Sequence, residues 1–152
     1  MGQEVCSTDI CWANAVMVIA AKRRKHLARS EILRLLGDIA NQPQEHFVVM
    51  TFDGGGRLIN RHLVYIGTID RIEIHMRDVF AKAIPDFPAA IIVSHSHPSG
   101  DPSPSKDDIS TTQQLLAAGQ LLQIPVIDHI IVAGDRHYSF VANGLIFPEL
   151  KP

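Results

Sequence analysis

The feature that most constrains the fold of this chain is a short apolar run at residues 89–93, which leads directly into a segment rich in histidine, serine and proline. The run is five residues long, contains three β-branched residues and is flanked by prolines, so it predicts a buried strand rather than a helix. Residues two apart on a strand point to the same face, so His95 and His97 are expected to project together at its end. A Pro/Ser/Gly loop follows, and a helix is expected to begin at Ser105.

The first turn of that helix contains Asp108, whose carboxylate can reach back toward the two imidazoles. Two histidines and one carboxylate form a three-ligand set for zinc that leaves the fourth position open for water. Each residue also has an ordinary structural explanation, because Ser105 and Asp108 fit an S-x-x-D variant of the helix capping box. A capping carboxylate can still bind metal, so we predict a zinc site with His95, His97 and Asp108 as ligands.

The segment H-S-H-P-S-G-D-P-S-P-S-K-D-D resembles the signature of the JAMM (JAB/MPN) metalloproteases, and its P-S-G-D-P-x-P-S form resembles the bacterial RadC branch. In the JAMM pattern, H-x-H-P is followed by a six-residue gap and S-x-x-D, and this register selects Asp108 as the carboxylate ligand. The resemblance covers about residues 44–140. It implies an α/β fold in which a mixed β-sheet is flanked by helices, a JAB/MPN-like domain with the three layers of the cytidine deaminases.

The same resemblance implies roles for two further residues. Glu45 matches the glutamate on the strand before the first hairpin, which takes a proton from the zinc-bound water and returns it to the leaving amine. The Ser105 hydroxyl would help to hold the developing oxyanion. Without the resemblance, Glu45 is an unremarkable carboxylate at a strand start. Its neighbour His46 is expected to point to the opposite face of that strand.

The function that these residues favour is a zinc-dependent hydrolase of the JAMM type, and the wider family implies a peptide or isopeptide bond in a peptide or protein substrate. The alternatives are a RadC-like protein associated with DNA repair and a non-enzymatic MPN binding module. Inactive MPN domains lose metal ligands, whereas this chain keeps all of them. Longer RadC proteins carry a helix–hairpin–helix DNA-binding module, and none is recognisable in residues 1–44.

Charge gives no argument for wholesale DNA binding, because the net charge is -2 and the pI is about 6.4. The basic cluster at residues 22–26, with Arg29 beyond it, is either the solvated end of a helix or a small phosphate-contacting patch. The two cysteines are too few for a disulfide framework, and neither a signal peptide nor a membrane-spanning run is visible. We therefore expect a cytoplasmic protein that does not contact membranes, of unknown oligomeric state.

Hydrophobic periodicity predicts the remaining elements. An N-terminal helical segment, residues 1–43, is expected to precede a RadC-like domain at residues 44–152, and the two to form one compact unit. Asp128 and His129 lie inside an apolar run, either as a pair near the site or as an internal pair that fixes strand register. Further helices are expected at 7–21, from Ser30 to a stop at residues 41–43, at 75–84 and at 105–123, and strands at 45–52, 57–66, 126–132 and 138–140.

Overall fold

A computed structural model describes residues 28–67 and 74–146 of the chain. The helix expected at residues 7–21 and the basic cluster at 22–26 lie outside these described residues. Most of the N-terminal segment expected at residues 1–43 also lies outside them, so the division at residue 43 stays a prediction.

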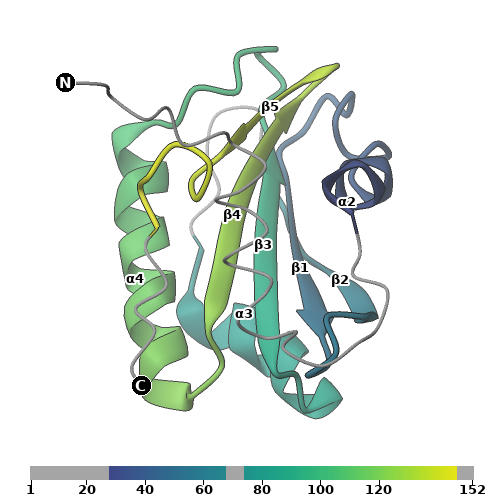
Figure 1. Cartoon of the computed structure of the whole chain (residues 1–152). Coiled ribbons are helices and arrows are strands. Elements are labelled where there is room, and N and C mark those ends of the chain that lie inside the picture. Colours follow the sequence, from purple (N-terminus) through teal and green to yellow (C-terminus); the bar gives the residue numbers. More distant parts are fainter. Residues whose placement is uncertain (1–27, 68–73, 147–152) are drawn as a thin grey trace, which may run out of the picture.

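The described residues form one five-stranded mixed sheet, with the strand order β2-β1-β3-β4-β5 (Figure 1). β3 pairs with β1 in the antiparallel and with β4 in the parallel direction, and the outer pairs β1–β2 and β4–β5 are antiparallel. β3 is buried along its whole length, as its apolar sequence predicts. The strands are β1 (His46–Phe52), β2 (Leu58–Ile66), β3 (Ala90–Ser96), β4 (Val126–Ala133) and β5 (Arg136–Ser139).

Helices cover both faces of this sheet, so the molecule has three layers. α3 (Met76–Ala83) and α4 (Lys106–Leu122) pack against one face, where Val79, Phe80 and Leu115 share a core cluster with Phe47 and Val93. On the other face, α2 (Arg29–Leu35) contributes Ile32 to a cluster that contains Met50 and Ile92. Neighbouring strand residues enter opposite clusters, as the alternation of side chains requires. The expected fold, a mixed sheet flanked by helices, is confirmed.

The parallel crossover from β3 to β4 passes through α4, which brings the first turn of this helix back to the end of β3. Ser105 is the N-cap residue: its hydroxyl accepts a hydrogen bond from the Asp108 N–H at 3.1 Å, and the Asp108 carboxylate accepts one from the Ser105 N–H at 2.7 Å. This reciprocal capping box satisfies two N–H groups that helix geometry leaves without partners. The helix therefore begins where the sequence predicted.

Two predicted elements differ at their ends. The helix predicted from Ser30 ends at Leu35. Turns follow it, in which the N–H of Leu36 donates to the carbonyl of Leu33 and the N–H of Ile39 to that of Leu36. Leu36 and Ile39 therefore stay buried although they lie outside the helix. The last strand begins at Arg136, two residues before the predicted start, because β5 extends to the β4–β5 turn. Register with β4, rather than local sequence, sets that boundary.

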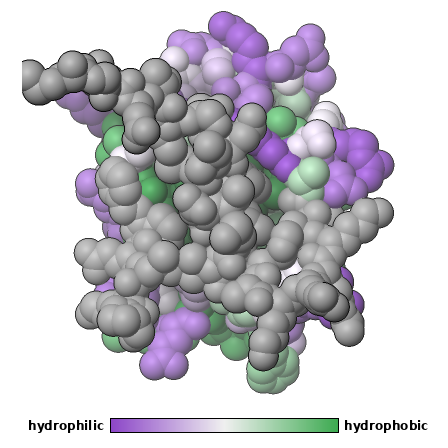
Figure 2. Space-filling view, in the orientation of Figure 1, coloured by the Kyte–Doolittle hydropathy of each residue, from purple (hydrophilic) through white to green (hydrophobic). Residues whose placement is uncertain are grey.

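Hydrophilic side chains gather along the upper edge of the molecule in Figure 2, where the loop between β3 and α4 runs in Figure 1. None of the helices in residues 28–67 and 74–146 combines the length and apolar character needed to cross a membrane.

Candidate metal centre

Four polar side chains that the sequence singled out meet at the C-terminal end of β3. His95 lies in β3, His97 follows it directly, and Asp108 lies in the first turn of α4. Phe47 of β1 pairs with His95 of β3 in antiparallel register, and extending that register by two residues places Glu45 opposite His97. The strand pairing thus brings together residues separated by about fifty positions in the sequence.

The distances between these side chains are short. The Nε2 atoms of His95 and His97 are 2.9 Å apart, and the Asp108 carboxylate lies 3.0 Å from the first through Oδ1 and 3.4 Å from the second through Oδ2. Ligand atoms of a tetrahedral zinc site are about 3.3 Å apart, given Zn–N bonds of about 2.0–2.1 Å. Glu45 Oε1 is farther away, at 3.9 Å and 3.8 Å from the two Nε2 atoms. Glu45, His95 and His97 also form a group that could hold a metal ion, with one potential ligand atom each within 4.8 Å of the others.

Burial and mutual contacts shift the acidity of this cluster. Burial raises the pKa of Glu45, and the imidazoles of His95 and His97 offset this only in part. Burial alone would also raise the pKa of Asp108, but hydrogen bonds with His95, His97 and Ser105 hold it well below its usual range. Asp108 is thus favoured as an anion, while Glu45 has a greater affinity for a proton than an exposed glutamate.

The loop between β3 and α4 orients His97. The Nδ1 atom of His97 lies 2.8 Å from the carbonyl oxygen of Asp101, which can only accept, so Nδ1 carries a proton. The Asp101 side chain is held in turn by the N–H and hydroxyl of Ser103, at 3.0 and 2.8 Å. Gly100 has a φ of 80°, a left-handed conformation that a residue with a Cβ rarely adopts. A neutral His97 therefore directs the lone pair of Nε2 at the cluster.

The pair Asp128 and His129, whose role the sequence left open, divides between the two faces of β4. The fully buried His129 faces α4, with Nε2 at 2.8 Å from His95 Nδ1 and Nδ1 at 2.6 Å from the Thr112 hydroxyl. Asp128 accepts hydrogen bonds from the Ser139 hydroxyl at 2.7 Å and from the N–H groups of His129 and Val141 at 2.8 and 3.1 Å. Asp128 is therefore an internal hydrogen-bonded group, and His129 touches the cluster.

Thr112 is the residue of this region that the sequence analysis missed. It lies four residues after Asp108 in α4, so the two share one face of the helix. That spacing was a usable signal, but a buried threonine on a helix is ordinary as long as the position of β4 is not known.

Two further residues that the sequence singled out, Ser105 and His46, take different places. Ser105 donates its hydroxyl proton to Asp108 Oδ2 at 2.7 Å, and His46 contacts the carbonyl of Gln44 at 2.8 Å rather than the cluster.

The chemistry of these groups fits a metal cation. Nδ1 of His97 lies on the Asp101 carbonyl and Nδ1 of His95 on His129, so both rings direct Nε2 at the Asp108 carboxylate, and in neutral rings with the proton on Nδ1 these are two lone pairs. Only a proton or a cation can satisfy such a set of acceptors. Burial alone would lower the pKa of His97, but its hydrogen bonds with Asp108 and the Asp101 carbonyl raise it, as this competition for a proton requires. Two imidazole nitrogens and a carboxylate suit zinc and related transition metals.

Comparison with known protein families agrees with this geometry. The family model described as RadC-like JAB domain matches residues 27–145. This chain belongs to that family. The resemblance drawn from the histidine and proline segment is thereby confirmed, and the segment lies inside the matched region.

Relatives of this RadC-like JAB domain carry the name UPF0758 protein, which states no activity. The protein from Staphylococcus haemolyticus is 43% identical over 110 residues, covering 72% of this chain and 48% of the relative. The one from Pelobacter propionicus is 41% identical over 103 residues, covering 68% and 45%. The one from Methanospirillum hungatei is 40% identical over 137 residues, covering 88% and 61%. This chain thus spans about half the length of the curated relatives that it matches.

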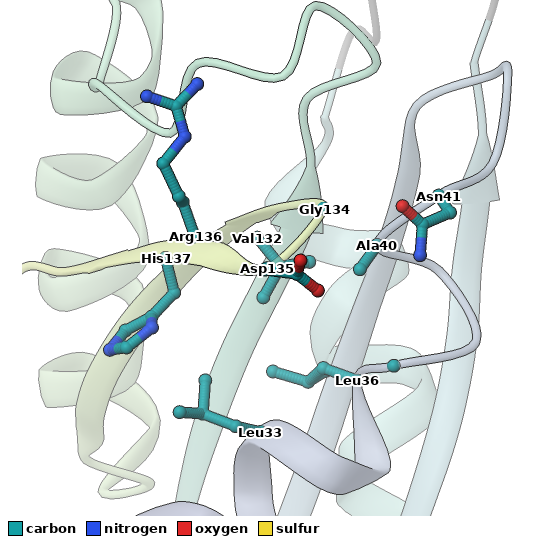
Figure 3. Close-up of a pocket in the computed structure, with 10 residues that line it drawn as sticks. Leu33, Leu36, Ala40, Asn41, Val132, Gly134, Asp135, Arg136 and His137 are labelled. Atoms are coloured by element: carbon teal, nitrogen blue, oxygen red, sulfur yellow. The ribbon is translucent and has the colours of Figure 1, made fainter.

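The RadC-like JAB domain also has a cavity of about 260 Å3 on the other side of the sheet (Figure 3). Leu33 and Leu36 form its floor below the turn between β4 and β5, where Gly134 and Asp135 lie. None of the four residues of the cluster lines this cavity, so it is separate from the candidate metal centre.

Proposed function

We propose that this RadC-like JAB domain is a zinc-dependent hydrolase that cleaves peptide or isopeptide bonds. The observation that carries the proposal is the convergence of two imidazole Nε2 atoms and one carboxylate within 2.9–3.4 Å, with a second carboxylate 3.8–3.9 Å from both imidazoles. Three protein ligands leave the fourth position of a tetrahedral zinc site open, and a further carboxylate beside that position suits catalysis.

The proposed ligands are His95, His97 and Asp108. Their spacing is close to the tetrahedral edge of about 3.3 Å, while Glu45 lies outside it. Asp108 is also held by Ser105, which binds Oδ2 through its N–H and hydroxyl, both at 2.7 Å. The capping box therefore orients a ligand as well as ending a helix.

Bound zinc would supply a Lewis acid that lowers the pKa of a water molecule to about 7 and polarises a carbonyl. Glu45 acts as the proton shuttle, because burial raises the pKa of its carboxyl toward the range that suits a general base and then a general acid. It accepts the proton of the attacking water and delivers it to the leaving amine. Ser105 can donate to the carbonyl oxygen of the substrate only after its hydroxyl turns away from Asp108.

Metal content and hydrolysis, measured on one set of purified variants, test this proposal. Elemental analysis is expected to find about one zinc per chain in the wild type and in Glu45→Gln, and little in His97→Ala and Asp108→Ala. Glu45→Gln retains the size and shape of the side chain but cannot take up the proton. On a peptide and isopeptide library, we therefore expect activity from the wild type and at least a hundredfold less from Glu45→Gln.

Two results would contradict these roles. Hydrolysis by Glu45→Gln at the wild-type rate would remove Glu45 from the proton transfer. Loss of zinc from Glu45→Gln, with zinc retained in Asp108→Ala, would exchange the roles of the two carboxylates, since Glu45 also lies in a group able to hold metal.

A further inference from the structure

We infer that Thr112 and His129 form a hydrogen-bond relay that determines which ring nitrogen of His95 carries the proton, and so leaves the lone pair of Nε2 facing the proposed metal site. The inference rests on the metal site proposed above, but the relay itself consists of contacts within the chain. His129 is a positioning residue in this relay, because it acts on the site through His95.

The first step of the relay has one possible proton arrangement. Thr112 Oγ1 lies 2.7 Å from the carbonyl oxygen of Asp108 and 2.6 Å from His129 Nδ1. Both contacts are hydrogen bonds, and the hydroxyl has a single proton. A carbonyl oxygen can only accept, so the hydroxyl donates to Asp108. The contact with His129 must therefore be a bond that its Nδ1–H donates to the hydroxyl.

The second step follows from the first. His129 is completely buried, and its two ring nitrogens contact Thr112 and His95 rather than a carboxylate. A neutral ring with its proton on Nδ1 has a lone pair on Nε2, which lies 2.8 Å from His95 Nδ1. His95 must then donate from Nδ1. Its Nε2 is left with the lone pair that faces His97 and Asp108, which is the form that binds a metal ion.

Packing holds the central ring of the relay in place. The ring of His129 stacks on Phe140, with centroids 4.8 Å apart and planes 9° from parallel, and meets Phe47 edge-on at 6.0 Å. Phe47 stacks on His95 from the other side, with centroids 6.1 Å apart. These three aromatic contacts oppose rotation of either imidazole, so the proton arrangement is not averaged by ring motion.

The relay also joins two ligands. It begins at the backbone of Asp108 in α4 and ends at the ring of His95 in β3, with β4 supplying the residue between them. A shift of the first turn of α4 relative to β4 would separate Thr112 from His129. The proton of His129 would then no longer be confined to Nδ1. The tautomer of His95 and the position of the carboxylate ligand are therefore set together.

Tautomers of the 15N-labelled, metal-free protein test the relay directly. Two-bond 1H–15N correlation spectra at a pH where the rings are neutral distinguish a proton on Nδ1 from one on Nε2. The wild type is expected to show His95 and His129 with the proton on Nδ1. Thr112→Val keeps the shape of the side chain but removes the hydroxyl, so the single tautomer of His95 is expected to be lost. Zinc affinity, measured by competition with a chromophoric chelator, is expected to fall 10- to 100-fold.

Two variants separate positioning from structural support. His129→Gln supplies an amide oxygen to accept from His95 and an amide N–H to donate to Thr112, so it should recover most of the zinc affinity that His129→Leu loses. Thr51→Val is the matched control, because Thr51 is a buried threonine of β1 whose hydroxyl donates to the Asp86 carboxylate at 2.7 Å rather than to a residue of the relay. Its zinc affinity and His95 tautomer should match the wild type.

The relay is wrong if Thr112→Val retains the Nδ1–H tautomer of His95 and binds zinc within twofold of Thr51→Val. A folded wild type that binds no zinc would contradict the proposed function instead, and the tautomer spectra would still decide the relay. If His129→Leu does not fold, Thr112→Val and His129→Gln carry the same test.

Discussion

Asp128 and His129 are neighbours in β4 with opposite surroundings, because successive side chains of a strand point to opposite faces. His129 lies on the face covered by α4, where it contacts Thr112 and His95. Asp128 enters the other face, where it is almost fully buried and accepts hydrogen bonds from Ser139, Val141 and the His129 N–H. Two adjacent residues of a strand therefore need not serve the same site, and Asp128 and His129 are tested by separate experiments.

Burial raises the pKa of Asp128 to about 6, although three hydrogen bonds to its oxygens act in the opposite direction. The carboxyl of the unfolded chain has a pKa of about 3.9, so the fold favours the protonated form. The stability that this proton provides is complete below about pH 4 and is lost as the pH rises through about 6, a change of about 3 kcal/mol.

Asp128→Asn is permanently neutral and keeps an oxygen for the N–H groups of His129 and Val141, so this part of the pH dependence should vanish. Urea unfolding at several pH values between 4 and 7 measures the effect. The wild type is expected to lose stability relative to Asp128→Asn across that range. A difference between the two proteins that does not change with pH would contradict the prediction.

At the scale of elements, α4 matters most, because its two ends serve different purposes. Its first turn carries Asp108 and Thr112 to the site. Its last turn must reverse sharply into β4, and Gln123 closes the helix in the left-handed conformation with a φ of 58°. Ile124 donates its N–H to the carbonyl of Gly119 at 2.9 Å, so the chain passes directly over that glycine.

Gly119→Ala is expected to destabilise the fold. A Cβ at this position would lie 2.6 Å from the carbonyl oxygen of Ile124 and 3.1 Å from Val126 Cγ2. Alanine favours a helix by about 1 kcal/mol over glycine, but relieving a backbone clash costs about 1–3 kcal/mol, so the net effect should be unfavourable. Gly54→Ala is the control, because a Cβ there would meet nothing within 4 Å. Urea unfolding that finds both variants as stable as the wild type would refute the clash.

At the scale of the whole molecule, the candidate site joins three parts of the chain that have no local connection. Glu45 directly precedes β1, His95 lies in β3 with His97 directly after that strand, and Asp108 lies in α4. A metal ion held by His95, His97 and Asp108 at once binds the folded state and not the unfolded chain, so it stabilises the entire fold.

Zinc is therefore expected to raise the unfolding temperature of the wild type. At a free zinc concentration one hundred times the dissociation constant, the free energy of unfolding should rise by about 2.7 kcal/mol. Removing the metal with a chelator should reverse the shift. Asp108→Ala lacks one proposed ligand and should show a much smaller shift at the same zinc concentration. Equal shifts in the two proteins would mean that the stabilising metal binds elsewhere.

The sequence by itself determined the local parts of this protein. The buried strand before His95 and the helix capped by Ser105 are visible because each depends on residues within a few positions of one another. The family resemblance added Glu45 and the register that selects Asp108. Among the elements within residues 28–67 and 74–146, only the ends of some were misplaced, such as the start of β5, where pairing with a neighbouring strand decides the boundary.

Only the tertiary structure decided the strand order, the meeting of Glu45 with the two histidines, and the relay through Thr112 and His129. Each of these depends on side chains from different elements coming within about 3–4 Å, which is set by the pairing of β1 and β4 with β3 and the packing of α4. Periodicity describes which face of an element is buried but not which element will cover it. The partners of a buried polar group are therefore known only once the fold has brought them together.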